Sequence, residues 1–169
     1  LYIFYRKLEE KMDNVLIAMN TKHAKGVFSS ILRLPQFYKN DEEMRQKAKD
    51  LLAIFDLDQK VNTLAKNLPY GEQRRLEIVR ALATEPKILF LDEPAAGMNP
   101  QETAELTELI RKIQYEFGLT IILIEHDMSL VMDVCERIYV LEYGHVIAQG
   151  TPTEIKSNPK VIEAYLGGE

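Results

Sequence analysis

A short apolar run that ends in two adjacent acids constrains most strongly what this chain can fold into. Residues 88–91 have the length and composition of a buried strand, and Asp92 and Glu93 follow directly. Pro94 then stops the strand, because proline has no amide to donate to a sheet. Two carboxylates at the end of a buried strand are costly unless they have a partner. In doubly wound sheets, ligands bind at this end of the strands.

Magnesium-assisted phosphate hydrolysis is a chemistry that suits this pair of acids. Asp92 would hold Mg²⁺ through water, and Glu93 would orient or deprotonate the water that attacks a γ-phosphate. A strand that simply ends in a polar turn would carry the same residues. The pair alone therefore leaves both interpretations open.

The segments on either side favour the catalytic interpretation. Upstream stands Asn-Leu-Pro-Tyr-Gly-Glu-Gln-Arg-Arg-Leu-Glu at residues 67–77, and downstream stand Ala-Ala-Gly-Met-Asn-Pro at 95–100 and Ile-Ile-Leu-Ile-Glu-His-Asp at 121–127. In order and spacing these segments resemble the signature motif, Walker B motif, D-loop and H-switch of ABC transporter ATPases. The resemblance runs from about residue 13 to the C-terminus, and within the family the chain is most similar to the ATPase subunits of branched-chain amino acid importers.

The resemblance implies ATP and Mg²⁺ as cofactors and a role for each motif. Asp92 and Glu93 would form the Walker B pair, and His126 would contact the γ-phosphate and position Glu93. Asn99 would take the D-loop place, where Asp is common. The signature segment would act in trans on the ATP held by a second subunit, through Tyr70, Gly71, Glu72 and Gln73.

Two departures from the family pattern affect nucleotide binding. Pro69 stands where the signature motif usually has Ser, which removes a hydroxyl and a backbone donor. No G-x-x-x-x-G-K-[ST] motif occurs, and no glycine is followed by lysine. The segment that normally supplies the Q-loop glutamine is also not recognisable in residues 1–12. We therefore expect the C-terminal part of an ATPase subunit, with nucleotide-binding sequence upstream.

Local patterns predict mostly helices in the first half of the chain. One helix is expected over residues 13–19 with Asp13 as its N-cap, and a second over 27–34, ending before Pro35. A third is expected after an Asn40 cap, and a fourth within residues 68–84. By resemblance, residues 1–86 would form a helical subdomain that includes the signature motif.

The second half of the chain, residues 87–169, alternates strand and helix patterns. Buried strands are expected at 88–91 and 119–124, joined by a helix that begins at the Asn99-Pro100 cap. A hairpin is expected over 138–148, and short capped helices follow. The predicted fold class is α/β: a partial P-loop NTPase-like ABC ATPase core with a parallel sheet, beside the helical subdomain.

Composition excludes several other classes. The chain has 169 residues, 46% of them hydrophobic and 28% charged, which suits an ordinary globular protein. A net charge of −5 without a Lys/Arg block argues against nucleic acid as a partner. The single cysteine, Cys135, excludes an internal disulfide and is expected in the core. No apolar run has the length of a membrane span, so membrane attachment would need partner proteins.

Three functions remain open at this level. The first is the ATPase subunit of a branched-chain amino acid importer, on the cytoplasmic face of the cell membrane. Its partners would be a second ATPase subunit, in a homo- or heterodimer, the transmembrane permease subunits and, indirectly, a periplasmic or extracellular substrate-binding protein. The second is the ATPase of a lipopolysaccharide exporter, whose family has sequences similar to Gly-Thr-Pro-Thr-Glu-Ile at residues 150–155. The third is a non-catalytic partner that lends only a signature surface.

The missing P-loop segment also has a structural consequence. In this family the P-loop strand lies beside the Walker B strand, so without it residues 88–91 would have an unpaired side and uncovered apolar faces. We expect the chain to self-associate there, or residues 1–5, which are rich in strand formers, to pair with the free side.

Overall fold

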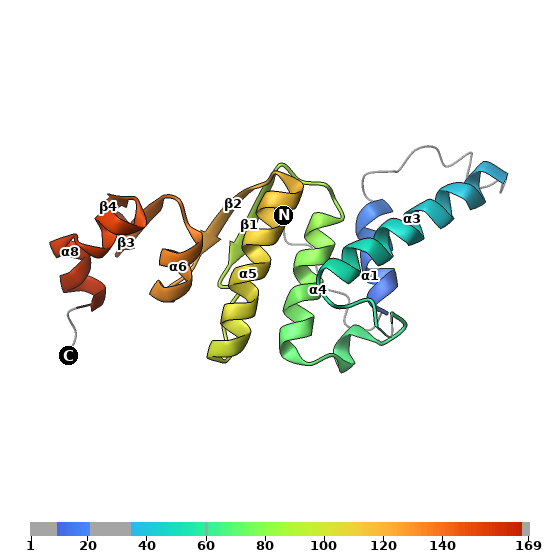
Figure 1. The fold of residues 1–169 in the computed structure, drawn as a ribbon, viewed down its shortest axis with the longest axis horizontal. Helices are drawn as coiled ribbons and strands as arrows, with labels where there is room; N and C mark the ends of the chain where they lie inside the picture. The colour runs from blue at the N-terminus through green and yellow to red at the C-terminus, as the bar shows by residue number, and fades with distance from the viewer. Residues whose placement is uncertain (1–9, 21–34, 60, 167–169) are drawn as a thin grey trace. The chain divides into compact units, whose positions relative to one another are not determined.

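The computed structural model describes residues 10–20, 35–59 and 61–166 (Figure 1). The chain divides into two compact units, Leu1–Leu89 and Phe90–Glu169. The functional division at residue 86, into a helical subdomain and an ATPase core, stays a prediction.

Helices make up the described part of the first unit. They are α1 (Lys11–Asn20), α3 (Pro35–Ile54), the short 3-10 turn η1 (Ala65–Asn67) and α4 (Tyr70–Leu82). Helices α1, α3 and α4 pack against one another. Each helix contributes an apolar face to the core of this unit, with fully or almost fully buried side chains at Met12, Val15, Ala48, Leu52, Leu76 and Val79.

Two predicted helix starts are wrong in this unit. Helix α1 begins at Lys11, so Asp13 lies inside its first turn. Backbone carbonyls cap this end: the N–H groups of Lys11 and Met12 donate to the carbonyls of Thr63 and Val61 at 3.1 and 3.2 Å. A side-chain cap is therefore not needed there.

Helix α3 likewise begins before the predicted cap. It starts at Pro35, five positions ahead of Asn40. Proline suits a first helical position because its φ is already helical and its missing amide is not needed there. The helix predicted over 27–34 lies outside the described residues.

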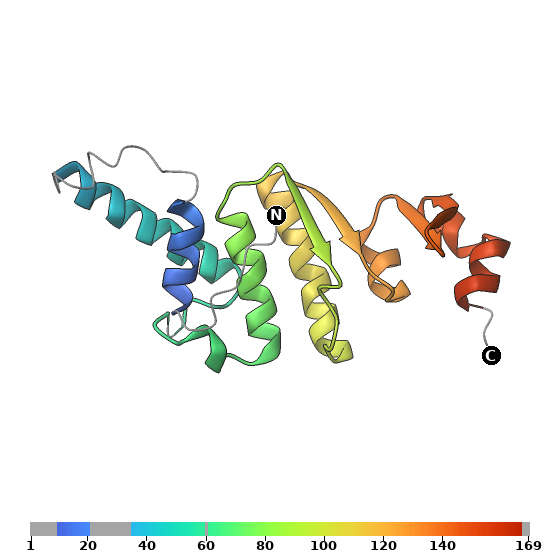
Figure 2. The same ribbon diagram turned by 180° about the vertical axis from the view of Figure 1, so that it is seen from behind.

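A strand-helix-strand unit carries the predicted Walker B segment. Strand β1 (Ile88–Asp92) pairs with β2 (Thr120–Ile124), and α5 (Pro100–Phe117) connects them. The N–H of Glu93 donates to the carbonyl of Ile124 at 2.8 Å, so both strands end side by side and run parallel (Figure 2). The parallel arrangement predicted from the two apolar runs is confirmed.

The predicted caps of α5 are also confirmed. The Asn99 side chain accepts from the N–H of Glu102, whose carboxylate accepts from the N–H of Asn99, and Pro100 takes the first position. Gly118 ends the helix at φ 58°, a left-handed conformation that glycine adopts without steric cost.

The apolar runs alone predict burial of β1 and β2 on both faces, and that prediction is wrong, whereas the uncovered apolar faces of β1 expected without a P-loop strand are found. Side chains alternate along both strands, and one set is exposed: Ile88 at 49%, Phe90 at 67%, Ile122 at 41% and Ile124 at 55%. Among the described residues these two strands form a sheet of two, and no further layer covers this apolar face. A sequence suited to burial on both faces is thus covered on only one.

A hairpin and short helices complete the second unit. Strand β3 (Ile138–Glu142) pairs antiparallel with β4 (His145–Gly150), as predicted. Tyr143 and Gly144 form the turn with φ of 46° and 80°, the signs that a type I′ turn needs. Around it lie α6 (Met128–Val134), α7 (Pro152–Lys156), α8 (Pro159–Val161) and the π turn η2 (Ile162–Leu166).

The hairpin and these helices share one apolar cluster. Its buried members come from α6, both strands of the hairpin, α7 and α8: Val131, Ile138, Val140, Ala148, Ile155 and Val161. Cys135 packs against this cluster and is partly buried, and burial raises the pKa of its thiol. The cysteine predicted for the core thus lies at the edge of this cluster and is only partly buried. No helix in the described ranges is long and apolar enough to cross a bilayer.

Candidate functional site

The two predicted Walker B acids lie at the C-terminal end of β1, with exposed side chains. Asp92 is the last residue of the strand, and Glu93 is the first residue beyond it. Glu93 has φ 44°, in the left-handed region that non-glycine residues rarely adopt. Such a conformation persists only where its surroundings hold it, and strained residues of this kind cluster at functional sites.

The predicted H-switch histidine lies opposite Glu93. Nδ1 of His126 is 3.7 Å from Oε1 of Glu93, and both side chains are more than half exposed. The two residues come from the ends of adjacent parallel strands, 33 positions apart in numbering (126 − 93). The structure thus brings together a carboxylate and an imidazole that the sequence predicted to act together.

A third residue of this site, Glu125, was not predicted. Its side chain is only 1% exposed. Its Oε1 accepts from the N–H of Ala95 at 3.0 Å, and its Oε2 accepts from the N–H of His126 at 3.2 Å. Oε2 also lies 3.8 Å from Nδ1 of His126. The one signal for Glu125 in the sequence is an acid directly after an apolar strand.

The turn between β1 and α5 is ordered by its own backbone. The N–H of Ala96 donates to the carbonyl of Glu93 at 3.1 Å, and the N–H of Met98 donates to the carbonyl of Ala95 at 3.0 Å. The turn leads to Asn99, whose side-chain oxygen caps α5 at 3.0 Å from the N–H of Glu102. The residue predicted for the D-loop is therefore positioned by the helix that it starts.

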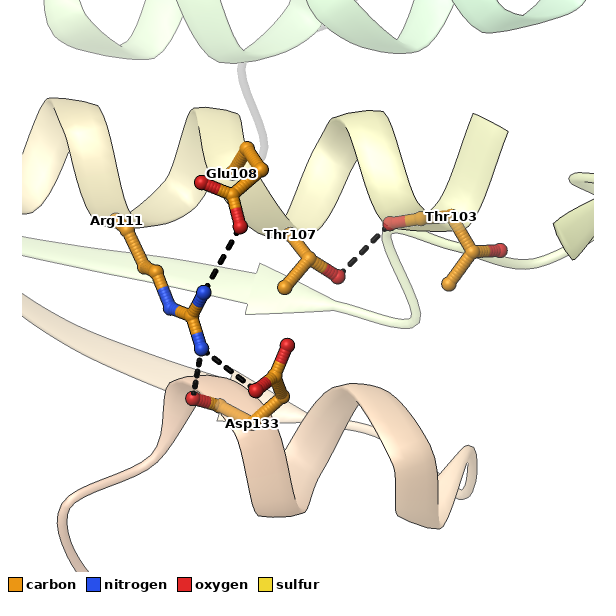
Figure 3. A network of polar contacts seen from close by, with 5 residues as sticks. All are labelled: Thr103, Thr107, Glu108, Arg111 and Asp133. Atoms are coloured by element: carbon orange, nitrogen blue, oxygen red, sulfur yellow. Dashed lines mark hydrogen bonds and ion pairs between the residues drawn. The ribbon is translucent and has the colours of Figure 1, made fainter. Parts of the chain in front are cut away.

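Helix α6, which follows His126, is fixed at both ends. Asp127 caps its N-terminus by accepting from Ser129 and Leu130 at 2.9 and 3.3 Å. At the other end Nη2 of Arg111 donates to Oδ1 and the carbonyl oxygen of Asp133 at 2.6 and 2.7 Å (Figure 3). The same guanidinium donates to Glu108 at 2.8 Å. Arg111 thus ties α6 to α5 and neutralises the C-terminal end of the helix dipole.

The predicted signature segment opens α4 in the other unit. Pro69 precedes the helix with φ −53° and ψ 153° and provides no side-chain cap. In the first turn of α4, Gly71 is buried, Glu72 and Gln73 are partly buried, and Tyr70 is exposed. The Gln73 side chain donates to the carbonyl of Leu68 at 2.8 Å and closes the loop on itself. Arg74 stacks on the Tyr70 ring at 5.2 Å.

The carboxylates of this site suit the binding of a magnesium ion whose other ligands are phosphates and water. In the described part of the chain, no three metal-ligating side chains converge. Mg²⁺ at such sites is held by one or two carboxylates, with phosphates and water as the other ligands. Asp92 offers one exposed carboxylate at the strand end, which suits that arrangement.

Two family models match the chain. Residues 5–96 match the model described as ABC transporter. Residues 145–169 match the model described as branched-chain amino acid ATP-binding cassette transporter.

Curated relatives agree with these matches. The chain is 49% identical over 156 residues to the high-affinity branched-chain amino acid transport ATP-binding protein LivG of Salmonella typhimurium, covering 92% of this chain and 61% of that protein. It is 43% identical over 156 residues to BraF of Pseudomonas aeruginosa, a protein of the same description, with the same coverage. It is 35% identical to the methionine import ATP-binding protein MetN 2 of Bacillus cereus, of which it covers 46%. The chain thus spans about three fifths of the length of LivG and BraF.

Solved structures show the same relationship. The ADP conformation of MJ1267, an ATP-binding cassette of an ABC transporter, superposes with a TM-score of 0.76 at 30% identity, covering 96% of this chain and 64% of that one. The structure of cbiO1 from Clostridium perfringens, part of the ABC transporter complex cbiONQ, gives a TM-score of 0.69 at 29% identity, covering 89% of this chain and 55% of that one.

Proposed function

Because the chain belongs to the ABC transporter family, we propose that it is part of an ATP-hydrolysing subunit that drives the import of branched-chain amino acids. The observation that carries the proposal is the pair of Glu93 and His126, 3.7 Å apart at the C-terminal end of two parallel strands. A general base and a phosphate-sensing side chain must lie this close to act on one reacting group.

Each site residue receives a role within this proposal. Glu93 orients or deprotonates the attacking water, and its left-handed backbone aims the carboxylate at that water. His126 donates to the γ-phosphate as charge develops on it and holds Glu93 in place. Asp92 would hold Mg²⁺ through water; when bound, the ion neutralises charge on the phosphates.

A second subunit completes the active site in the proposal. The signature segment, Tyr70–Gln73 at the start of α4, supplies backbone N–H groups to the nucleotide of that second subunit. Asn99, at the start of α5, takes the D-loop role in the proposal. Permease subunits and, indirectly, a substrate-binding protein are the further partners, which would place the chain on the cytoplasmic face of the membrane.

The substrate proposal rests on the likeness to importers. Residues 145–169 match the branched-chain amino acid model, and LivG and BraF carry that substrate in their descriptions. These likenesses favour import of branched-chain amino acids over lipopolysaccharide export. A non-catalytic role is favoured only by Pro69 and by the lack of a G-x-x-x-x-G-K-[ST] motif, whereas Asp92, Glu93 and His126 are all in place.

Uptake of labelled leucine tests the proposed function. Cells lacking the gene should lose high-affinity leucine uptake and keep uptake of an unrelated sugar. The intact gene should restore leucine uptake, and a Glu93→Gln version should not. Normal leucine uptake together with lipopolysaccharide retained in the inner membrane would contradict the import proposal and favour the exporter.

A further inference from the structure

Glu125 is a buried acid that joins two segments far apart in the chain. Its carboxylate accepts from Ala95, in the turn after β1, and from His126, in the segment after β2. The two hydrogen bonds use different oxygens, Oε1 and Oε2. Ala95 lies 30 positions away along the chain, so the first of these bonds is a tertiary link.

Burial makes this arrangement costly unless the carboxylate does something that an apolar residue could not. The side chain is 1% exposed, and a buried carboxylate loses its hydration. An apolar side chain of similar size would avoid that loss, but would leave the N–H of Ala95 without its acceptor. A carboxylate is the side chain that can accept at two oxygens at once.

We infer that Glu125 is a positioning residue that fixes the backbone of His126 relative to the turn between β1 and α5. The turn leads to Asn99, so a displacement at the start of α5 is passed through Ala95 and Glu125 to His126. The catalytic consequence rests on the proposed function of Glu93 and His126. The positioning itself rests on the two hydrogen bonds.

The isosteric change Glu125→Gln tests this inference sharply. Glutamine keeps the size of the side chain but accepts at only one oxygen, and its NH₂ group opposes the second N–H donor. Amide hydrogen exchange of the 169-residue chain, followed by NMR, should show faster exchange at Ala95, at His126 or at both, by about tenfold for each lost bond. Glu125→Ala should raise both rates.

A matched control separates this effect from general loosening. Glu154 is a carboxylate that accepts from the N–H of Thr151 at 2.8 Å in the cap of α7. Glu154→Ala should leave the exchange of Ala95 and His126 unchanged. Unchanged exchange at both amides in Glu125→Gln would overturn the inference, because a carboxylate that merely fills space tolerates this replacement. If Glu125→Ala fails to fold, the Glu125→Gln result still decides.

A kinetic measurement then tests the consequence for catalysis. In the chain extended at its N-terminus by a P-loop segment, Glu125→Gln should lower kcat about tenfold or more and leave KM for ATP within about twofold, since its buried carboxylate accepts from two backbone amides of the protein itself. An unchanged kcat would overturn the catalytic part. Full activity of Glu93→Gln would instead overturn the proposed function, and the exchange rates would still judge the positioning of His126.

Discussion

The backbone N–H of Glu93 donates to the carbonyl of Ile124 at 2.8 Å. Glu93 is the first residue after β1, and Ile124 is the last residue of β2. This bond ties the backbone of Glu93, which has a left-handed φ of 44°, to β2, and the Nδ1 atom of His126, two residues after Ile124, lies 3.7 Å from Oε1 of Glu93. The geometry of the candidate site therefore depends on the pairing of two strand ends.

Glu93→Gln should remove turnover and keep nucleotide binding. The amide has the size and hydrogen-bonding reach of the acid but cannot accept a proton as a base. In the chain extended by a P-loop segment, we expect ATPase activity to fall about 10²-fold or more while ATP-bound dimers still form. Steady-state hydrolysis and size-exclusion chromatography with ATP measure the two effects.

Glu102→Gln is the matched control for this change. Glu102 lies nine positions on (102 − 93) and closes the capping box of α5, a role that glutamine also fills. It should leave turnover unchanged. If Glu93→Gln kept turnover within about threefold of the parent protein, Glu93 would not be the base.

His126→Ala should slow hydrolysis without preventing nucleotide binding. The imidazole contact matters most when charge develops on the γ-phosphate, so its loss should lower kcat by about 10²-fold and leave the Kd for ATP nearly constant. His145→Ala, which changes an exposed histidine at the start of β4, should alter neither value. Loss of ATP binding with an unchanged maximal rate would contradict the role given to His126.

The 169-residue chain alone should neither bind ATP tightly nor hydrolyse it. The reason is the missing G-x-x-x-x-G-K-[ST] segment, whose backbone and lysine supply most of the contacts to the phosphates. Titration calorimetry with Mg-ATP should give no binding at micromolar concentrations. Micromolar affinity together with turnover in the purified chain would refute this.

Arg111→Met should lower the free energy of unfolding of the second unit by about 1 kcal/mol. The guanidinium is partly exposed, so each of its ion pairs contributes little, but it also satisfies the carbonyl of Asp133 at the end of α6 (Figure 3). Lys112→Met makes the same kind of change at the next residue and should lower the free energy of unfolding by less. Urea unfolding followed by circular dichroism measures the stability of both variants. Equal urea midpoints for the two variants would contradict a stabilising link from Arg111 to α6.

Local patterns predicted the parts of the fold that local chemistry decides. The capping box at Asn99, the left-handed Gly118 and the hairpin turn at Tyr143-Gly144 each follow from a few neighbouring residues. The start of α1 could not be predicted in this way. Its first amides, those of Lys11 and Met12, are capped by the carbonyls of Thr63 and Val61, which lie 52 (63 − 11) and 49 (61 − 12) positions away.

The sequence predicted three residues of the candidate site, but it did not predict the hydrogen bonds of Glu125 that link them to the turn after β1. Asp92, Glu93 and His126 follow apolar strands, so their positions at one sheet edge could be expected. The link through Glu125 could not, because its partner Ala95 contributes only a backbone N–H and has no side-chain signature. The roles of these residues in catalysis stay predictions.

The last prediction concerns the exposed apolar face of β1 and β2. Ile88, Phe90, Ile122 and Ile124 are all exposed on it, and in the described ranges β1 pairs with β2 alone. Exposed apolar strands with a free edge favour association with another chain. We therefore expect the purified chain to form dimers or larger species, detectable by light scattering, unless residues 1–5, which lie outside the described residues, pair with β1.

Single charges on and off this face separate the causes of association. Phe90→Lys places a charge where the side chain is 67% exposed and should shift the chain towards monomers. Tyr115→Lys makes a similar change on α5, where the side chain is 90% exposed, and should leave the association as it was. One result would refute both self-association and the pairing of residues 1–5 with β1. It is a stable monomer of the unchanged chain in which the amides of residues 88–91 are protected from exchange and those of residues 1–5 exchange freely. In that case the covered side of β1 alone would hold the strand in place, and the apolar run would need no partner at its free edge.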